Sequence, residues 1–426
     1  MTPTGEMESV TARAAQRVSD GAAAERRARE ARSLPKPQVA VLTGGGDRPY
    51  ALGLAASLID QGICFDFIGS DHLEGPEVHS SPLIRFLNLR GDARTDAAKV
   101  AKVMRVLRYY GRLLRYAATA EPKVFHVLWN NKIEAFDRTL VLLYYRLLGK
   151  RIVFTVHNVN AGTRDGNDGL MNRLTLRSQY HLSDHLFVHT RRMKEELQAD
   201  FAVAERKITV IPFGINSTVP DTPMTASEAR QRLGLSQTDK VLLFFGHIAP
   251  YKGLEYLVEA IAALKDRVPA CRLVIAGRPK GSEAYWASVS ERISSLGIES
   301  QIIRRIEYIP DEDTEVYFKA ADAVMLPYTH VFQSGVLFLA YNFGLPAIAS
   351  DVASLREDIV EGETGFVCRP RDSAALADAI ERFFESGLYA SLAARRSTIR
   401  RFAAEHYSWT TVGSITGEVY RTLTSE

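Results

Sequence analysis

Short runs of consecutive apolar residues recur along the chain, and segments with helical spacing separate them. A run that is apolar on both faces is typical of a parallel strand that helices cover on both sides. Six such runs lie in the first half of the chain, at residues 39–43, 64–68, 124–129, 151–156, 185–189 and 208–212. Six more lie in the second half, at residues 241–245, 272–276, 301–303, 323–326, 347–349 and 365–368. The pattern predicts an α/β fold with two consecutive doubly wound parallel sheets, whose ligands bind at the carboxyl ends of strands.

The boundary between the two sheets is expected in residues 213–238, where two prolines and several serines and threonines interrupt the rhythm like a linker. A chain of 426 residues is also too long for one ordinary core. Residues 37–212 then form an N-terminal domain, and residues 239–404 form a C-terminal domain. Residues 1–36 contain no aromatic residue and no apolar stripe, so we expect a flexible tail.

Composition excludes several classes of protein. No run of about 18 apolar residues exists that could span a membrane, and the tail lacks the apolar core of a secretory signal. Cys64, Cys271 and Cys368 are too far apart for a zinc site and odd in number, which favours a reducing cytoplasm over a disulfide framework. The net charge of +3 gives no overall affinity for nucleic acid.

A glycine triplet, Gly44 to Gly46, follows the first predicted strand and precedes a helix. Glycines let a ligand approach the backbone, and the helix N-terminus offers free N–H groups to an anion. A tight strand-to-helix turn explains the same residues equally well. The third glycine of a dinucleotide fingerprint would fall at Pro49, so a nicotinamide-dependent enzyme is disfavoured.

Two further loops in the second half have the composition of phosphate-binding turns. Gly246 is followed by Lys252 and Gly253 at the start of a helix, where the ammonium group can meet a diphosphate or simply face solvent. This is not a P-loop, because no Ser or Thr follows the lysine. Ser334 and Gly335 open another helix, for which Ser334 is the expected cap.

Together these elements resemble the bacterial family 4 glycosyltransferases, which have the GT-B architecture of two Rossmann-like domains facing a cleft. The resemblance covers about residues 37–426. The order and spacing of five segments carry it: residues 246–253, 334–346, 349–357, 362–367 and 407–409.

The resemblance implies a hexosyltransferase that moves a sugar from a UDP- or GDP-sugar, bound by the C-terminal domain, to an acceptor on the N-terminal domain. The acceptor would be a saccharide or a polyprenyl-linked saccharide, in the synthesis of a surface polysaccharide or glycolipid. Such enzymes are often retaining and need no cofactor or metal besides the nucleotide-sugar co-substrate. Residues 405–426 would form a last helix that crosses back to the N-terminal domain.

The resemblance also assigns site residues. Lys252 would contact the donor diphosphate, and His157 would lie near the transferred sugar. Gly45, Gly46 and Asn158 would line the cleft from the acceptor side. The donor-binding set would be Gly246, Lys252, Gln333, Ser334, Gly335, Val336 and Leu337.

The sequence departs from the family at two places. His247 stands nearest to where the family often has an arginine beside the lysine, and we expect it to assist Lys252. Val331 and Leu339 occupy the ungapped positions of two glutamates that usually contact the donor. Gln333, His330 and Asn342 are candidates to replace them. The missing glutamates also keep open an alternative, a non-catalytic GT-B subunit that binds sugar or partners.

Residues 97–118 show helical periodicity with an apolar stripe and a basic face, and they contain no acid. The six cations are Lys99, Lys102, Arg105, Arg108, Arg112 and Arg115. Packing of the stripe on the sheet is one interpretation, with the basic face in solvent. The other is attraction to the anionic inner leaflet, which would make a cytoplasmic enzyme peripheral to the membrane. By contrast, residues 311–313 are interpreted as helix N-terminal acids rather than a metal-binding Asp-x-Asp.

Overall fold

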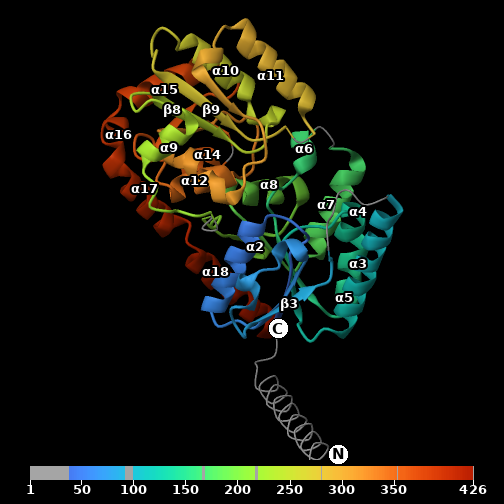
Figure 1. The fold of residues 1–426 in the computed structure, drawn as a ribbon. Helices are drawn as coiled ribbons and strands as arrows, with labels where there is room; N and C mark the ends of the chain where they lie inside the picture. Colours follow the sequence, from blue (N-terminus) through green and yellow to red (C-terminus); the bar gives the residue numbers. More distant parts are fainter. Residues whose placement is uncertain are drawn as a thin grey trace, which may run out of the picture.

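The computed structural model describes residues 38–91, 99–165, 168–215, 219–279, 281–352 and 354–425. The expected tail, residues 1–36, lies outside the described residues. The described chain forms two parallel sheets covered by helices, one above the other in Figure 1. This confirms the prediction of two doubly wound domains.

The N-terminal sheet has seven strands in the order β3-β2-β1-β4-β5-β6-β7. They are β1 (Val39–Leu42), β2 (Phe65–Gly69), β3 (Ile84–Asn88), β4 (Val124–Val127), β5 (Arg151–Thr155), β6 (His185–Val188) and β7 (Ile208–Val210). All pairs are parallel. The pattern of apolar runs did not predict β3, because this edge strand is only partly buried and Arg85 interrupts its apolar run.

Helices cover both faces of this sheet. One face carries α3 (Lys99–Thr119), α5 (Leu142–Leu147), α7 (Leu170–Leu182) and α8 (Arg191–Phe201), which share a core with β4, β5 and β6. Short α4 (Glu134–Phe136) and a π-helical turn, Asp137–Val141, lead directly into α5, and α6 (Ala161–Asp165) follows β5. The other face carries α2 (Arg48–Asp60) and the last helix of the chain, α18 (Trp409–Ser425).

The C-terminal sheet has six parallel strands in the order β10-β9-β8-β11-β12-β13. They are β8 (Lys240–Phe245), β9 (Cys271–Ala276), β10 (Ile302–Arg305), β11 (Ala323–Leu326), β12 (Ala347–Ser350) and β13 (Gly365–Cys368). Its helices are α9 (Ala226–Leu233), α10 (Leu254–Ala263), α11 (Glu283–Ser295), α12 (Asp311–Ala320), α13 (Gly335–Asn342), α14 (Leu355–Asp358), α15 (Ser373–Glu385), α16 (Gly387–Ala390) and α17 (Leu392–His406).

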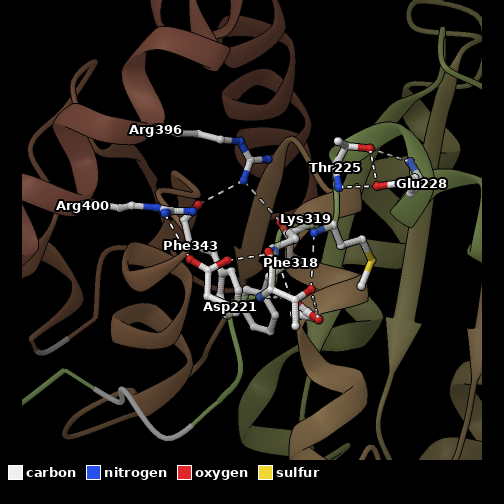
Figure 2. A network of polar contacts seen from close by, with 11 residues as sticks. Asp221, Thr225, Glu228, Phe318, Lys319, Phe343, Arg396 and Arg400 are labelled. Atoms are coloured by element: carbon white, nitrogen blue, oxygen red, sulfur yellow. Dashed lines mark hydrogen bonds and ion pairs between the residues drawn. The ribbon is translucent and has the colours of Figure 1, made fainter.

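The segment expected to be a linker is partly folded onto the C-terminal domain. Helix α9 lies inside it and begins with a capping box between Thr225 and Glu228. Upstream, Asp221 forms ion pairs with Lys319 of α12 (2.9 Å) and Arg400 of α17 (3.2 Å), as Figure 2 shows. The polar residues that resemble a linker in sequence therefore cap and anchor a helix.

The chain returns to the N-terminal domain through α18. The Trp409 indole donates a hydrogen bond to the Ile215 carbonyl at 2.8 Å, and the Tyr420 hydroxyl lies 2.5 Å from His126 Nδ1 under the N-terminal sheet. Two chain segments therefore connect the domains. None of the helices in the described ranges is long and apolar enough to cross a membrane.

Candidate active site

The glycine triplet forms a tight loop between β1 and α2. Gly44 and Gly45 have positive φ values of +59° and +77°. A Cβ atom on Gly44 would lie 2.0 Å from the Trp129 carbonyl oxygen, and one on Gly45 would lie 1.8 Å from Arg90 Nη1. Arg90 also donates a hydrogen bond to the Gly44 carbonyl at 2.5 Å. Arg90 and Trp129, which sequence analysis did not single out, therefore hold the loop from two sides.

His157 follows β5 and lies beside the same glycine loop, on the far side of Trp129. Its ring stacks on the Trp129 indole with a centroid distance of 4.2 Å and an interplanar angle of 4°. Tyr50 meets the imidazole edge-on at 4.7 Å. A Cβ on Gly46 would lie 2.0 Å from the Trp129 ring, so the predicted residues Gly45, Gly46 and His157 do come together. Asn158, the next predicted cleft residue, is exposed.

A hydrogen-bond relay determines which nitrogen of His157 carries the proton. His189 Nδ1 lies 3.4 Å from the Ile211 carbonyl, which only accepts, so this nitrogen donates. Its Nε2 is then the acceptor for His157 Nδ1–H at 3.2 Å. His157 Nε2 is left as a buried lone pair with no hydrogen-bond partner among the described residues. Burial, followed by the neighbouring His189, holds the pKa of His157 well below its usual 6.5.

Lys252 belongs to the C-terminal domain and lies in the short turn Pro250–Lys252 after β8. Its side chain is only 6% exposed, and its Nζ makes one long hydrogen bond, 3.4 Å, to the Phe245 carbonyl. No carboxylate pairs with this ammonium group within the described ranges, and burial lowers its pKa. A Cβ on Gly246 would lie 3.2 Å from Nζ and 3.8 Å from Val336 Cγ2, so the lysine and α13 are close neighbours. A buried cation without a counter-ion is suited to an anionic ligand.

Helix α13 presents its N-terminus beside Lys252. Ser334 occupies the predicted cap position, but its side chain forms no cap hydrogen bond and instead donates to the Tyr328 hydroxyl oxygen at 3.5 Å. The Leu337 amide donates to the Ser334 carbonyl at 3.1 Å. The first two amides of the helix, those of Gly335 and Val336, therefore remain at its open end.

Gln333 is the candidate that the structure equips best to replace the missing glutamates. Its Nε2 donates to Asp358 Oδ2 at 3.4 Å, and Tyr407 donates to Asp358 Oδ1 at 3.0 Å. Burial raises the pKa of Asp358 to about 7. The Gln333 Oε1 atom is buried and has no hydrogen-bond partner in the described part of the chain.

A small pocket of about 220 Å³ lies between the domains, where Tyr50 from one set of residues faces Gly335 and Val336 from the other, and neither His157 nor Lys252 lines it. Its lining residues are Asp47, Pro49, Tyr50, Phe213, Gly214, Gly335, Val336, Leu339 and Trp409. Leu339, at one of the two glutamate positions, lies in this wall, and Val331 at the other is buried. A larger hollow of about 440 Å³ lies beside Asp221 and Arg400, and neither glycine loop lines it.

Two protein-family sequence models match this chain, one for each domain. Residues 225–401 match the sequence model of "Glycosyl transferases group 1", and residues 44–219 match that of "Glycosyltransferase Family 4". The chain belongs to the family 4 glycosyltransferases. It is therefore a nucleotide-sugar-dependent glycosyltransferase of the GT-B fold.

Similar proteins support the assignment. The D-inositol 3-phosphate glycosyltransferase of Corynebacterium glutamicum is 26% identical over 357 residues, which is 81% of this chain and 85% of the relative. Sucrose-phosphate synthase from Thermosynechococcus elongatus superimposes with a TM-score of 0.72 at 18% identity, over 91% of this chain and 99% of that one. HepE of Anabaena, in complex with UDP and glucose, gives 0.68 at 16% identity, over 91% and 100%. At such identities the two structures show the shared fold.

The other residues predicted from sequence do not line this pocket, and one of their side chains lies outside the described residues. His247 is exposed in the turn between Gly246 and Lys252. The six cations belong to α3, where Lys102, Arg108, Arg112 and Arg115 are exposed, Arg105 is half-buried and the Lys99 side chain lies outside the described residues. Residues 311–313 form the first turn of α12, as predicted. No group of three His, Cys, Asp or Glu with metal-binding spacing occurs in the described ranges.

Proposed function

We propose that this glycosyltransferase moves a sugar from a UDP- or GDP-sugar, held by the C-terminal domain, to a saccharide or polyprenyl-linked acceptor held by the N-terminal domain. The observation that carries the proposal is the buried Lys252 ammonium group, which lacks a carboxylate partner in the described chain and lies beside the open end of α13. The product would serve a surface polysaccharide or glycolipid. Burial of all three cysteines suits an enzyme of the cytoplasm.

The donor diphosphate fits between Lys252 and the Gly335 and Val336 amides. When the bond from the sugar C1 to the diphosphate oxygen breaks, negative charge grows on the leaving group. A fixed cation and a helix N-terminus stabilise that charge without a metal ion. The acceptor oxygen then bonds to C1, and its proton passes to the leaving phosphate oxygen. We expect retention of configuration, and an inverted first product in nuclear magnetic resonance would contradict it.

His157 positions a hydroxyl group in this mechanism. Its Nε2 lone pair can accept a hydrogen bond from the transferred sugar or the acceptor. Because its depressed pKa makes it a weak base at neutral pH, we assign proton removal to the diphosphate instead. The unpaired Gln333 Oε1 accepts a second donor hydroxyl, where other family members use glutamate.

A thermal-shift titration of the purified chain with UDP, GDP and ADP tests the donor site. A ligand that binds only the folded state raises Tm by mass action. We expect UDP to give the largest shift, because the similar fold of HepE holds UDP. The same nucleotide's sugar should be hydrolysed slowly in the absence of acceptor, with or without chelator. No shift with any diphosphate, or a shift without any turnover of the matching sugar, would favour the alternative of a non-catalytic sugar-binding subunit.

A further inference from the structure

Large apolar side chains are exposed together on one layer of the N-terminal domain. Six of them define an apolar patch, and each is at least 58% exposed: Val100, Leu107, Leu140, Leu147, Leu170 and Met171. Elsewhere in the described chain, beyond α3, α7 and the segment 133–148, only Tyr308 and Val360 are exposed large hydrophobic residues. A concentration of this kind marks a surface that another apolar phase covers.

The patch spans neighbouring helices. The Tyr144 hydroxyl of α5 donates to the Leu114 carbonyl of α3 at 3.3 Å. On the other side, Arg138 in the π-helical turn donates to Asn172 of α7 at 3.0 Å. Figure 1 shows α3, α4, α5 and α7 side by side at one end of the domain. The exposed stripes of these helices therefore belong to one continuous layer.

Packing of the α3 stripe on the sheet was one of the two interpretations, and it holds only for the second half of the helix. Tyr110 and Leu113 are buried, whereas Val100, Val103 and Leu107 are exposed. The first turns of α3 thus present apolar and cationic side chains to solvent together. This combination is typical of a helix that lies in a bilayer interface.

The charge of α3 distinguishes two occupants of the patch. A two-fold contact between copies uses the same surface twice, so it would bring the cations of both copies into one interface. An anionic bilayer instead offers an apolar phase for the patch and headgroups for the cations. We propose that the apolar patch inserts into the interface of an anionic bilayer, with Lys102, Arg108 and Arg112 bound to lipid headgroups.

The position of the patch suits the reaction. Tyr109 of α3 donates to Asn131 Oδ1 at 2.6 Å, two residues beyond Trp129 in the acceptor wall. The Arg90 guanidinium, which holds the glycine loop, lies 5.9 Å from the Tyr109 ring. Insertion of the patch would therefore bring the acceptor wall close to the headgroups, where a polyprenyl-linked saccharide projects. The identity of the acceptor in this inference rests on the proposed function. The experiment that tests membrane insertion needs neither the nucleotide-sugar donor nor the acceptor.

Vesicle flotation of the full chain tests the insertion, with phosphatidylcholine vesicles that contain or lack phosphatidylglycerol. The variant Leu147→Ser/Leu170→Ser/Met171→Ser removes part of the patch, and Tyr308→Ser/Val360→Ser is the matched control. We expect the triple variant to bind anionic vesicles about tenfold or more weakly, since each lost side chain removes apolar burial. The control should bind like the wild type. The variant Lys102→Gln/Arg108→Gln should instead reduce the salt dependence of binding.

Three outcomes would overturn the inference. They are no binding of the wild type to anionic vesicles, unchanged binding of the triple variant, or a wild-type dimer in light scattering that the triple variant dissociates without any change in vesicle binding. Circular dichroism and the UDP thermal shift, measured without lipid, report whether each variant is folded. Normal donor turnover without vesicle binding would refute this inference alone, whereas lost donor turnover in the wild type would refute the proposed function.

Discussion

Lys252 places an ammonium group in an apolar wall, over the faces of Tyr328 and Phe244 at 5.5 and 5.9 Å. Rings give such a cation partial compensation, but less than a carboxylate would. The buried charge therefore lowers the stability of the empty enzyme, and a donor diphosphate would relieve that cost. Function and stability should respond in opposite directions when this one residue is changed.

We predict that Lys252→Met lowers turnover of the nucleotide sugar by about 10²–10³, the typical effect of losing one charge-stabilising contact. Tm should stay the same or rise, because an apolar side chain of similar length replaces a buried charge. Steady-state kinetics and calorimetry check both effects, with the exposed Lys265→Met as control. Turnover within about threefold of wild type would show that Lys252 does not act on the leaving group.

Asp358 makes a second residue-level prediction. Its raised pKa of about 7 means that the folded chain retains a proton that the unfolded chain loses near the usual 3.8. Stability is therefore lost as pH rises from about 4 to 7. The variant Asp358→Asn cannot lose this proton, so its stability should not fall in the same way between about pH 4 and 7. The difference in free energy of unfolding, variant minus wild type, should therefore increase across this pH range by about 2 kcal/mol.

The same variant should weaken donor binding. The amide group that Asp358→Asn introduces has one acceptor oxygen, so it cannot accept from both Tyr407 and Gln333 as the two carboxylate oxygens do. The Gln333 side chain is then expected to turn its carbonyl inward. KM for the nucleotide sugar should increase more than kcat changes. A pH-independent stability difference, or an unchanged KM, would contradict the proposed pairing.

Some residues of the site could be predicted from sequence and others could not. Gly45, Gly46, Gly246 and Lys252 follow strands, and the carboxyl ends of parallel strands converge, so local pattern was sufficient to choose them as candidates. Arg90, Trp129 and His189 reach the site only through tertiary contacts, and no local motif marks them. These three residues share one feature, a position just after the strands β3, β4 and β6. That feature identifies them as neighbours only when the order of strands in the sheet is known.

At the scale of elements, α18 packs against α2 of the N-terminal domain through close contacts. The Trp409 ring fills the space beside Gly53 of α2 and Gly214, where added Cβ atoms would lie 2.2 Å from ring carbons. On the next turns, a Cβ on Gly413 would lie 2.8 Å from the Ser57 carbonyl oxygen. These glycines allow the last helix to approach the acceptor domain.

We predict that Gly53→Ala destabilises the protein by about 2 kcal/mol, since overpacking forces the ring out of place. The control is Gly111→Ala in the interior of α3, where an added Cβ meets nothing within 4 Å. That change should stabilise slightly, by about 0.5–1 kcal/mol, through higher helix propensity. Chemical denaturation checks both variants, and equal effects would show that Trp409 is not tightly packed.

Elements with a strong internal pattern were predicted well. Continuous apolar runs identified all the described strands except β3, whose partial burial weakens that signal. Periodicity also located α3, but periodicity does not reveal how far the sheet extends beneath a helix. The exposure of Val100 and Leu107 therefore required the structure.

At the scale of the whole molecule, burial of neutral histidines is concentrated in the N-terminal domain. Burial lowers the pKa of His126 to about 3, of His185 to about 4 and of His189 to about 4, and it holds the pKa of His157 well below 6.5. As pH falls below 6.5, these histidines become protonated in the unfolded chain, whereas His185 and His189 stay neutral in the folded chain until about pH 4. Stability is therefore lost on acidification through this window.

We predict that the N-terminal domain unfolds first in acid, with a loss of about 1 kcal/mol per buried histidine at pH 5.5. Differential scanning calorimetry between pH 7.5 and 5 should separate one transition into two. His185→Gln should reduce the acid sensitivity, whereas His406→Gln, at an exposed histidine of the other domain, should not. A single transition with an unchanged Tm would exclude this mechanism.

The return of α18 also has a consequence for how the protein is made. The residues of α18 that complete the core of the first domain, Val412 and Tyr420, are synthesised after the whole donor domain. The acceptor domain therefore reaches its final packing only after the donor domain has been synthesised. A chain cut short before Trp409 would retain Lys252, Gly335 and Val336, yet it would lack the helix that closes the opposite half and the Trp409 wall of the pocket.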